Sequence, residues 1–285
     1  MPVTTYGGSG DPTRTIRLLW SGPGAAPPSR RGPKAVLSLP DILDTAVTIA
    51  DTTGRVSLRA VADRLDCTAM ALYTHVANRA ELLDLMYDRV HLEIDSPVGA
   101  SWQERVNHWS AQVLQLYVRH GWIGEVSLVR PVLGPGEQQT LEYLLEALAT
   151  SGIPSGSQIT VVAALFGAAR QGARMIREAR QAPAVTATDD LRWWQERMAA
   201  LAEFAPDFDQ RFPYFTRLTR SSVATPAAGV RPSGTPLMET AARDQFDRTV
   251  DLLLAGATQG VSPAVPAGPG AAAADTGPGS PRTVS

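Results

Sequence analysis

The stretch that most constrains the fold is residues 56–86, which is typical of two short helices joined by a tight turn and followed by a third helix. Ser57 is suited to cap the first helix, because its hydroxyl can accept a backbone amide that has no partner inside the helix. Thr68 is suited to the same role at the second helix, and Leu72 and Val76 then recur at helical spacing. Two helices of this length around a turn of about three to four residues form the helix-turn-helix unit. The second helix of that unit lies in the major groove of DNA.

The outward face of the expected second helix has the chemistry that a helix beside phosphates requires. It carries no carboxylate, and its side chains are small, hydroxylated or aromatic: Thr68, Ala69, Ala71, Tyr73, Thr74 and His75. We hypothesise that these residues face DNA, with Ala69 and Ala71 offering methyl contacts to thymine. The alternative is an ordinary helical hairpin inside an all-helical domain, which spacing and capping alone do not exclude.

Residues 39–86 resemble the DNA-binding region of the tetracycline-repressor (TetR) family of bacterial regulators. The matching segments are DILDTAVTIADTTG, VSLRAVADRLDCT and ALYTHVANRAELL, of which LYxHVxNRxEL is the most specific. A looser match continues through RHGWI and RPVLGPGEQQTLEYLLEAL, which resemble the helical ligand domain of the same family. Asp66 departs from the pattern, because many members have Gly there. We expect the turn to form with slight strain.

The resemblance implies an all-α fold, with an N-terminal three-helix helix-turn-helix DNA-binding domain and a larger C-terminal helical domain for ligand binding and dimerisation. It also implies binding to double-stranded DNA, with Ser57 at the start of the motif. In the family the position of Arg59 reaches a base edge or a phosphate, and the position of Arg79 clamps a phosphate. The alternative for Arg59 is a solvated surface arginine. The Tyr73 hydroxyl would reach a phosphate, or its ring would pack on the first helix.

Composition and apolar patterning divide the chain into a flexible basic N-terminal arm (1–36), the helix-turn-helix domain (37–84), the ligand-binding and dimerisation domain (85–256) and a disordered tail (257–285). The net charge of −2 means that any DNA contact comes from local patches. In the arm, Arg30, Arg31 and Lys34 directly precede the first expected helix, so we expect them to contact phosphates. We expect Arg14 and Arg17 to be plain charges of a disordered leader.

Two expected helices of the second domain bear on assembly. Residues 157–181 present a small-residue surface, and a final helix begins at Thr235 and Pro236. In the TetR family such helices pair with their copies in a second subunit as a four-helix bundle. We expect a homodimer on physical grounds as well, because two reading heads about 34–36 Å apart can read successive major grooves of a palindrome. The alternative is that these helices pack an ordinary intramolecular core.

A ligand pocket in the second domain would be apolar with a few polar groups. The candidates are aromatic residues with a small number of basic ones: Trp102, His108, Trp109, Tyr117, Phe166, Arg170, Arg174 and Trp194. The alternative for each of these residues is that it packs the core.

The sequence lacks common catalytic signatures, with no G-x-x-x-x-G-K-[ST], no H-E-x-x-H and no G-x-S-x-G. The four histidines lie too far apart in sequence for a local metal site, and we expect no metal and no cofactor. The single cysteine, Cys67, excludes a disulfide within the chain. There is no secretory signal, and no apolar run approaches the roughly 20 residues that span a membrane. We therefore expect a cytoplasmic protein without a membrane partner.

These observations together predict a ligand-responsive, sequence-specific transcriptional regulator. We expect a repressor that a small, largely apolar molecule releases from a palindromic operator. A transcriptional activator of the same fold remains an alternative. So do a dimeric helical interaction protein and an enzyme with a helical pocket, both without DNA binding.

Overall fold

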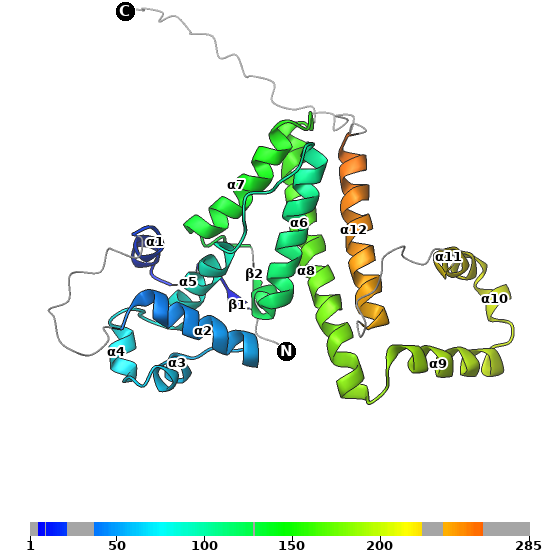
Figure 1. Cartoon of the computed structure of the whole chain (residues 1–285), viewed down its shortest axis with the longest axis horizontal. Coiled ribbons are helices and arrows are strands. Elements are labelled where there is room, and N and C mark those ends of the chain that lie inside the picture. The colour runs from blue at the N-terminus through cyan, green and yellow to red at the C-terminus, as the bar shows by residue number, and fades with distance from the viewer. Residues whose placement is uncertain (1–4, 9, 22–36, 128, 224–235, 259–285) are drawn as a thin grey trace, which may run out of the picture.

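The computed structural model describes residues 5–8, 10–21, 37–127, 129–223 and 236–258. Its described part is helical apart from one pair of two-residue strands, so the predicted all-α class is confirmed. Figure 1 shows a group of short helices at one end and a set of longer helices beside it. Along the described ranges, no helix combines the length and the apolar character that crossing a bilayer requires.

The N-terminal helices begin and end where their capping residues are. They are α2 (Leu39–Thr53), α3 (Leu58–Arg64), α4 (Ala69–Tyr73) and α5 (Arg79–His91). The hydroxyls of Ser38, Ser57 and Thr68 and the side chain of Asn78 each accept an amide from the first turn that follows, as the capping pattern predicts. Asp66, in the turn between α3 and α4, has a φ of 49°, which is the left-handed conformation expected there.

Helices α2, α3 and α4 form a small unit that we call the reading head. Ile42 and Ala46 of α2, Val61 of α3 and Leu72 of α4 are all fully buried and belong to one apolar core. Val76 completes this core from the segment before α5. Burial of several aliphatic side chains, each contributing about 1.5–3 kcal/mol, is what holds helices as short as α3 and α4 together.

The second group of helices is built around α8 (Ser155–Thr186), which packs on α6 (Trp102–Arg119) and on α12 (Leu237–Thr258). Helix α7 (Pro135–Ala149) covers α5 and α6, and a short turn of helix, η1 (Gly121–Glu125), follows α6. Gly172 allows α8 to approach α12 closely, because a Cβ atom there would lie 3.3 Å from the Phe246 ring. Glu239 of α12 is buried and pairs with Arg180 and Arg243 at 2.8 Å.

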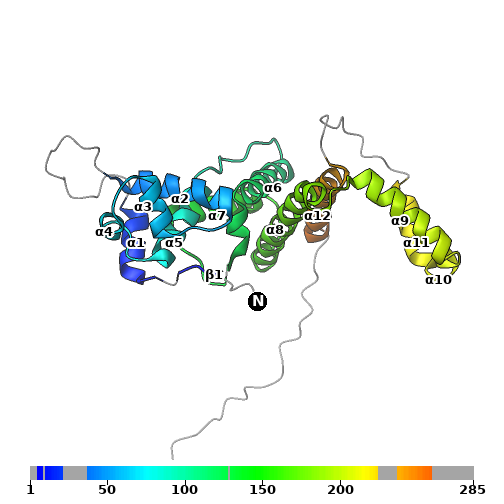
Figure 2. The same ribbon diagram turned by 90° about the horizontal axis from the view of Figure 1, so that it is seen from below.

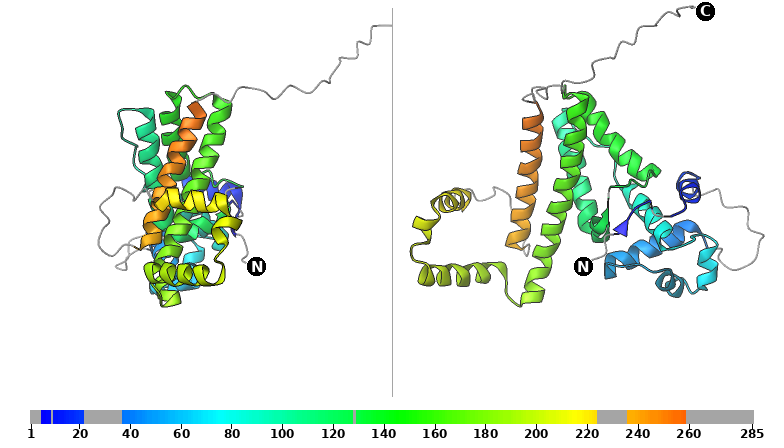
Figure 3. Two further views of the ribbon diagram at one scale, coloured as in Figure 1. Left: turned by 90° about the vertical axis from the view of Figure 1, so that its right-hand side faces the viewer. Right: turned by 180° about the vertical axis from the view of Figure 1, so that it is seen from behind.

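Helices α9 (Asp190–Phe204), α10 (Phe208–Arg211) and α11 (Pro213–Val223) form a projecting arm. Figures 1 and 2 show that the arm extends away from the other helices, and the views in Figure 3 agree. Helix α9 buries none of its residues. Large apolar side chains on the arm are exposed to solvent, among them Trp193, Trp194, Phe204, Tyr214 and Phe215.

The N-terminal region corrects one expectation. Residues 1–36 were predicted to be a flexible arm, but residues 12–20 form helix α1 (Pro12–Trp20). Asp11 caps this helix and Pro12 occupies its first turn, which favours a helix despite the polar composition. Ile16, Leu19 and Trp20 recur at helical spacing in this segment, which the prediction overlooked, and of α1 only Thr15 and Leu19 are buried. Arg30, Arg31 and Lys34 lie outside the described residues.

Residues 5–8 and 10–21 together form a strap that lies across both helical groups. Strand β1 (Thr5–Tyr6) pairs in parallel with β2 (Val126–Ser127), which follows η1. The Gly8 amide donates to Asp84 Oδ1 at 2.9 Å. At the other end of the strap, the Trp20 indole donates to the Leu133 carbonyl at 2.9 Å.

Arg14 connects the strap to the reading head. Its guanidinium pairs with Glu81, whose side chain is fully buried, at 3.0 Å. It also donates at 3.1 Å to the carbonyl of His75, just after α4. The prediction that Arg14 is a plain charge of a disordered leader was therefore wrong. Its guanidinium is the cation that pairs with a buried carboxylate.

At the C-terminal end, α12 continues to Thr258, two residues beyond the predicted boundary of the disordered tail. Residues 259–285 lie outside the described residues. The predicted boundary at residue 84 falls in the middle of α5, a helix that both helical groups share.

We predict that Arg14→Ala lowers the free energy of unfolding by about 1–2 kcal/mol, because Glu81 would lose its charged hydrogen-bond donor. Arg17→Ala is the matched control, since Arg17 is exposed on the same helix and should change stability by less than about 0.5 kcal/mol. Urea unfolding followed by circular dichroism measures both values. Equal effects of the two substitutions would show that the Arg14–Glu81 pair does not hold the strap in place.

Candidate functional site

The helix-turn-helix places its predicted contact residues in different environments. Ala69, Tyr73 and Thr74 are exposed along α4 and its end, whereas Ala71 and His75 are half-buried. The hydroxyls of Ser57 and Thr68 accept the amides of Ala60 and Ala71, so both residues serve first as helix caps. Met70, from which the sequence predicts at most a methyl contact to thymine, as from Ala69 and Ala71, is the most exposed large apolar residue of α4 at 74%.

Arg59 is a highly accessible basic residue of the motif, with 91% of its side chain exposed. Its single described ion pair is with Asp63 one turn later, at 4.0 Å. Such exposed pairs on one helix contribute about 0.3–0.5 kcal/mol, so Arg59 can leave Asp63 for a phosphate or a base at little cost. This exposure fits both interpretations of Arg59, as a DNA contact and as a solvated surface arginine, so the DNA contact stays a prediction.

Arg79 has a structural partner that the sequence did not indicate. Its Nε atom donates at 3.0 Å to the carbonyl of Val56, which joins the start of α5 to the segment before α3. The side chain therefore fixes the reading head relative to α5. The same position at the first residue of α5 leaves the other guanidinium nitrogens for a phosphate, so the clamp role stays a prediction.

Tyr73 is 48% exposed, and its ring contributes to the outward face of α4 rather than to the core. Thr74 donates its hydroxyl hydrogen to the Ala71 carbonyl at 2.6 Å, so toward DNA its hydroxyl can act mainly as an acceptor.

The sequence did not indicate that Arg14 is a neighbour of this face, where it donates to the carbonyl of His75. The available signal was the pairing of Asp11 with Pro12, which is typical of a helix start.

Three of the eight predicted ligand residues come together in the core of the second domain. Trp109 and Tyr117 of α6 are buried, and the Phe166 ring of α8 contacts the Trp109 ring edge-on with centroids 5.1 Å apart. The Trp109 indole donates at 2.8 Å to the carbonyl of Thr140 on α7. Trp102 is partly buried against the same core at the start of α6.

The other predicted ligand residues are placed elsewhere. Arg170 donates to the carbonyls of Gly124 in η1 and Val126 in β2, so it holds both elements against α8. Arg174 lies on the outer face of α8, where it pairs with Glu178 at 2.8 Å, and Trp194 lies on the projecting arm. His108 accepts the Val98 amide at 3.1 Å. Within one chain, grouping Arg174 and Trp194 with the aromatic core was wrong, because helical spacing does not say which face of a helix is covered.

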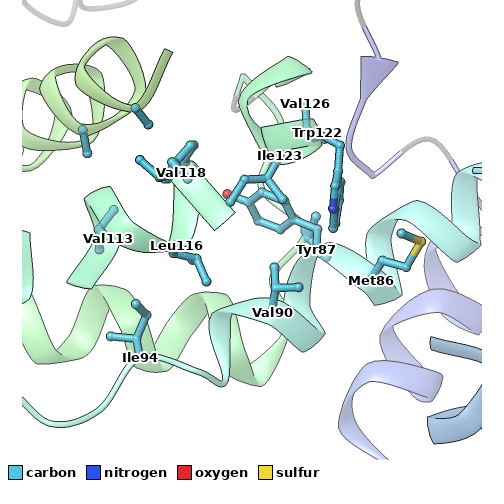
Figure 4. Packing of buried hydrophobic residues seen from close by; sticks show 14 of the residues in the cluster. Met86, Tyr87, Val90, Ile94, Val113, Leu116, Val118, Trp122, Ile123 and Val126 are labelled. Atoms are coloured by element: carbon cyan, nitrogen blue, oxygen red, sulfur yellow. The ribbon is translucent and has the colours of Figure 1, made fainter. Parts of the chain in front are cut away.

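Polar groups that the sequence reading missed also lie in this core. The His91 ring is 4.3 Å from the Tyr87 ring, centroid to centroid, and its Nδ1 atom donates to the Tyr87 carbonyl at 2.8 Å. Burial lowers the pKa of His91 to about 4, which keeps the imidazole neutral. Because Nδ1 carries the proton, Nε2 has an acceptor lone pair. Figure 4 shows Tyr87 among Val90, Ile123 and Trp122.

Several of these polar atoms are buried without a hydrogen bond from the described residues. They include His91 Nε2 and Ser110 Oγ, whereas the Tyr117 hydroxyl forms a side-chain hydrogen bond with that of Tyr87. Burial is the main cause that raises the pKa of both Tyr87 and Tyr117, so both phenols keep their protons. We call Tyr87, His91, Trp109, Tyr117 and Phe166 the effector core. Unsatisfied buried polar atoms are unusual in a packed interior, and each costs about 1–3 kcal/mol.

A helix-turn-helix within a three-helix reading head, joined to a larger helical domain, defines a class of helix-turn-helix DNA-binding transcriptional regulators. The chain is 33% identical over 228 residues to the HTH-type transcriptional repressor DrrR1 of Streptomyces coeruleorubidus, which covers 72% of this chain and 83% of that protein. An HTH-type transcriptional regulator of Saccharopolyspora erythraea is 31% identical over 150 residues, which cover 50% of this chain and 64% of that protein. Residues 97–225 match the family model for the tetracyclin repressor-like C-terminal domain.

The chain therefore belongs to the TetR family of DNA-binding transcriptional regulators, as the resemblance of its sequence predicted. The relatives named here are transcription factors rather than enzymes. The fold is shared with the TetR family protein ActR of Streptomyces coelicolor, whose structure in complex with actinorhodin superposes with a TM-score of 0.60 at 23% identity. That likeness covers 79% of this chain and 96% of ActR. A second ActR structure, in complex with (S)-DNPA, also gives a TM-score of 0.60.

Proposed function

We propose that this regulator is a ligand-responsive repressor that a small, largely apolar molecule releases from a palindromic operator. The observation that carries the proposal is that one chain combines an exposed reading face with a buried aromatic core that contains unsatisfied polar atoms. A repressor is favoured over an activator because the relative DrrR1, whose match covers 72% of this chain, is named a repressor.

The proposed DNA contacts divide by chemistry. Arg59 is the candidate for a base edge, because a guanidinium can donate two hydrogen bonds to guanine. Tyr73, Thr74, His75 and Arg79 are candidates for phosphates or sugars, which fix the position of the reading head without specifying sequence. The remaining proposed contacts are the helix caps, the small residues of α4 and the basic cluster of the N-terminal arm: Ser57, Thr68, Ala69, Ala71, Arg30, Arg31 and Lys34.

A homodimer would use the outward faces of α8 and α12. Ala163, Gly167 and Gln171 lie at helical spacing on the exposed side of α8, while Gly172 on the inner side faces Phe246. The small-residue surface of α8 therefore has an intramolecular half and an exposed half. The exposed half has room for a second pair of helices to approach closely, and a Cβ atom at Gly167 would meet nothing within 4 Å.

The projecting arm supports the same assembly. In the chain the projecting arm lies between α8 and α12, the two helices of the proposed interface. Its exposed aromatic side chains would be buried if the arm packed on the second subunit. A dimer in turn places two reading heads on one face of DNA, which is what a palindrome requires.

The proposed effector is apolar over most of its surface and carries at least one hydrogen-bond donor. Aromatic rings line the effector core, and the neutral His91 Nε2 atom can only accept a hydrogen bond. A hydroxylated aromatic compound has this chemistry. ActR, a protein of the same fold, has structures in complex with actinorhodin and with (S)-DNPA.

The mechanism would be differential affinity. An effector that binds better when α5, α6 and α7 move apart favours that arrangement, and it shifts the population only by the difference between its two affinities. Since α5 also supports the reading head, the favoured arrangement would change the spacing of the two heads. Operator affinity would fall as a result.

We predict that selection from random duplexes enriches a palindrome, with affinity that falls steeply as salt concentration rises. Arg59→Ala should weaken binding to this operator by about 1–3 kcal/mol and relax specificity at one position of each half-site. Arg105→Ala is the control, because this arginine lies on α6 and donates to Thr150. A folded protein that enriches no sequence would contradict the operator proposal. An unchanged affinity of Arg59→Ala would remove Arg59 from the interface.

We predict that Gly167→Glu converts the dimer to a monomer, because a charged side chain would stand where the second subunit's helices approach. Light scattering should then give a mass near the 30.4 kDa of one chain. Gln139→Glu, at an exposed position of α7, is the matched control and should leave the mass unchanged. If Gly167→Glu keeps the mass of the control, the subunits do not meet on this face of α8.

A further inference from the structure

His120 occupies a buried position between the reading head and the second domain. It follows the last residue of α6 and is 3% exposed. Its Nδ1 atom lies 2.9 and 3.0 Å from the two carboxylate oxygens of Asp51, near the end of α2. Its Nε2 atom lies 3.2 Å from the carboxylate of Glu93, just beyond α5. The Trp122 indole in η1 donates to the same Asp51 carboxylate at 2.9 Å.

The geometry requires a charged ring. Both nitrogens of His120 face carboxylate oxygens, which accept hydrogen bonds, and only an imidazolium donates from both nitrogens. Burial lowers the pKa of His120, but the hydrogen bonds and charges of Asp51 and Glu93 outweigh burial and raise the pKa above its ordinary value of 6.5. The ring is thus held in its charged form by one carboxylate from each side.

The other titratable and charged groups around His120 come from three helices. His91 on α5 stays neutral, since its own pKa is lowered to about 4. Arg119 on α6 pairs with Glu93 and shares that carboxylate with His120. Arg177 on α8 packs against Gly121, the residue after His120, and donates to the Tyr117 carbonyl at 3.3 Å.

The ion pairs of His120 connect the end of α6 to the reading head. Tyr117 of the effector core precedes His120 by one helical turn on α6, so a shift of this end of α6 moves both residues together. Asp51 lies in the last turn of α2, whose buried face supports α3 and α5. His120 and Trp122 therefore connect the end of α6 to the longest helix of the reading head.

We propose that His120, as an imidazolium, is a positioning residue that ties the reading head to α6 and so sets the orientation in which α4 is presented to DNA. The tie also gives an effector in the core a route to the reading head. That second half rests on the proposed function, whereas the tie itself can be tested on operator affinity without any effector.

The sign of the pH dependence follows from the raised pKa. The tie is complete below the ordinary histidine pKa of about 6.5 and is lost as the pH rises through the higher value in the folded protein. A reading head that is no longer tied loses more orientational freedom when it binds. Operator affinity should therefore fall as the pH rises.

The test uses the full-length protein and its selected operator duplex, with dissociation constants from fluorescence anisotropy at about pH 6 and about pH 8.5 at one ionic strength. The wild type should bind about fivefold more weakly at the higher pH. His120→Gln and Asp51→Asn should bind weakly at both pH values. Asp44→Asn is the matched control, because this carboxylate lies on the same helix but pairs with Arg89 of α5. It should behave like the wild type.

The diagnostic quantity is the pH dependence of operator affinity that His120→Gln removes. A proton NMR titration provides a second readout on the same protein. The His120 midpoint should lie above 6.5 and should fall in Asp51→Asn, even if His120→Gln fails to fold.

Two results would overturn the proposal. One is a His120 midpoint at or below 6.5. The other is a high midpoint combined with the same pH dependence of operator affinity in the wild type and in Asp51→Asn, which would leave His120 a purely structural residue. If the pH dependence is present but hydroxylated aromatic compounds never release the operator, the tie stands and the ligand-responsive function fails.

Discussion

The burial of acidic residues on α5 is the constraint on which the rest of the structure depends. Glu81, Asp84 and Asp88 are each less than 5% exposed on this helix. Burying a carboxylate is costly unless other groups donate to it or balance its charge. The partners come from three different parts of the chain: Arg14 and the Gly8 amide of the strap, the Ala77 amide before α5, and the Glu137 amide at the start of α7.

This constraint makes the two helical groups one unit. Burial raises the pKa of Asp84 and Asp88, which shows that the amides that donate to them offset only part of the cost. The strap and α7 are thereby positioned against the helix that supports the reading head. His120 adds a second connection, from α6 to α2. A change in the packing around α5 or α6 therefore has a direct physical route to the DNA-facing helices.

Local features of the fold could be predicted from the sequence, and contacts between distant segments could not. Ser57, Thr68 and Asn78 act within their own helical turns, so their capping roles were visible as short patterns. Arg14 and Glu81 are 67 residues apart, and nothing local distinguishes that arginine from Arg17. In the second domain, helical spacing found the buried Trp109 and Tyr117 but did not separate them from Arg174 or Trp194. Which face of α8 is covered depends on the docking of α6 and α12.

We expect the reading head and the second domain to unfold as one cooperative structure, because they share α5. Hydrogen–deuterium exchange across a urea series tests it most directly, since it reports the opening free energy of each helix. The slowest amides of α2, α5 and α6 should converge on one opening free energy. If the amides of α2 open well below the global free energy while α6 and α8 stay protected, the reading head is an independent domain and the account is contradicted.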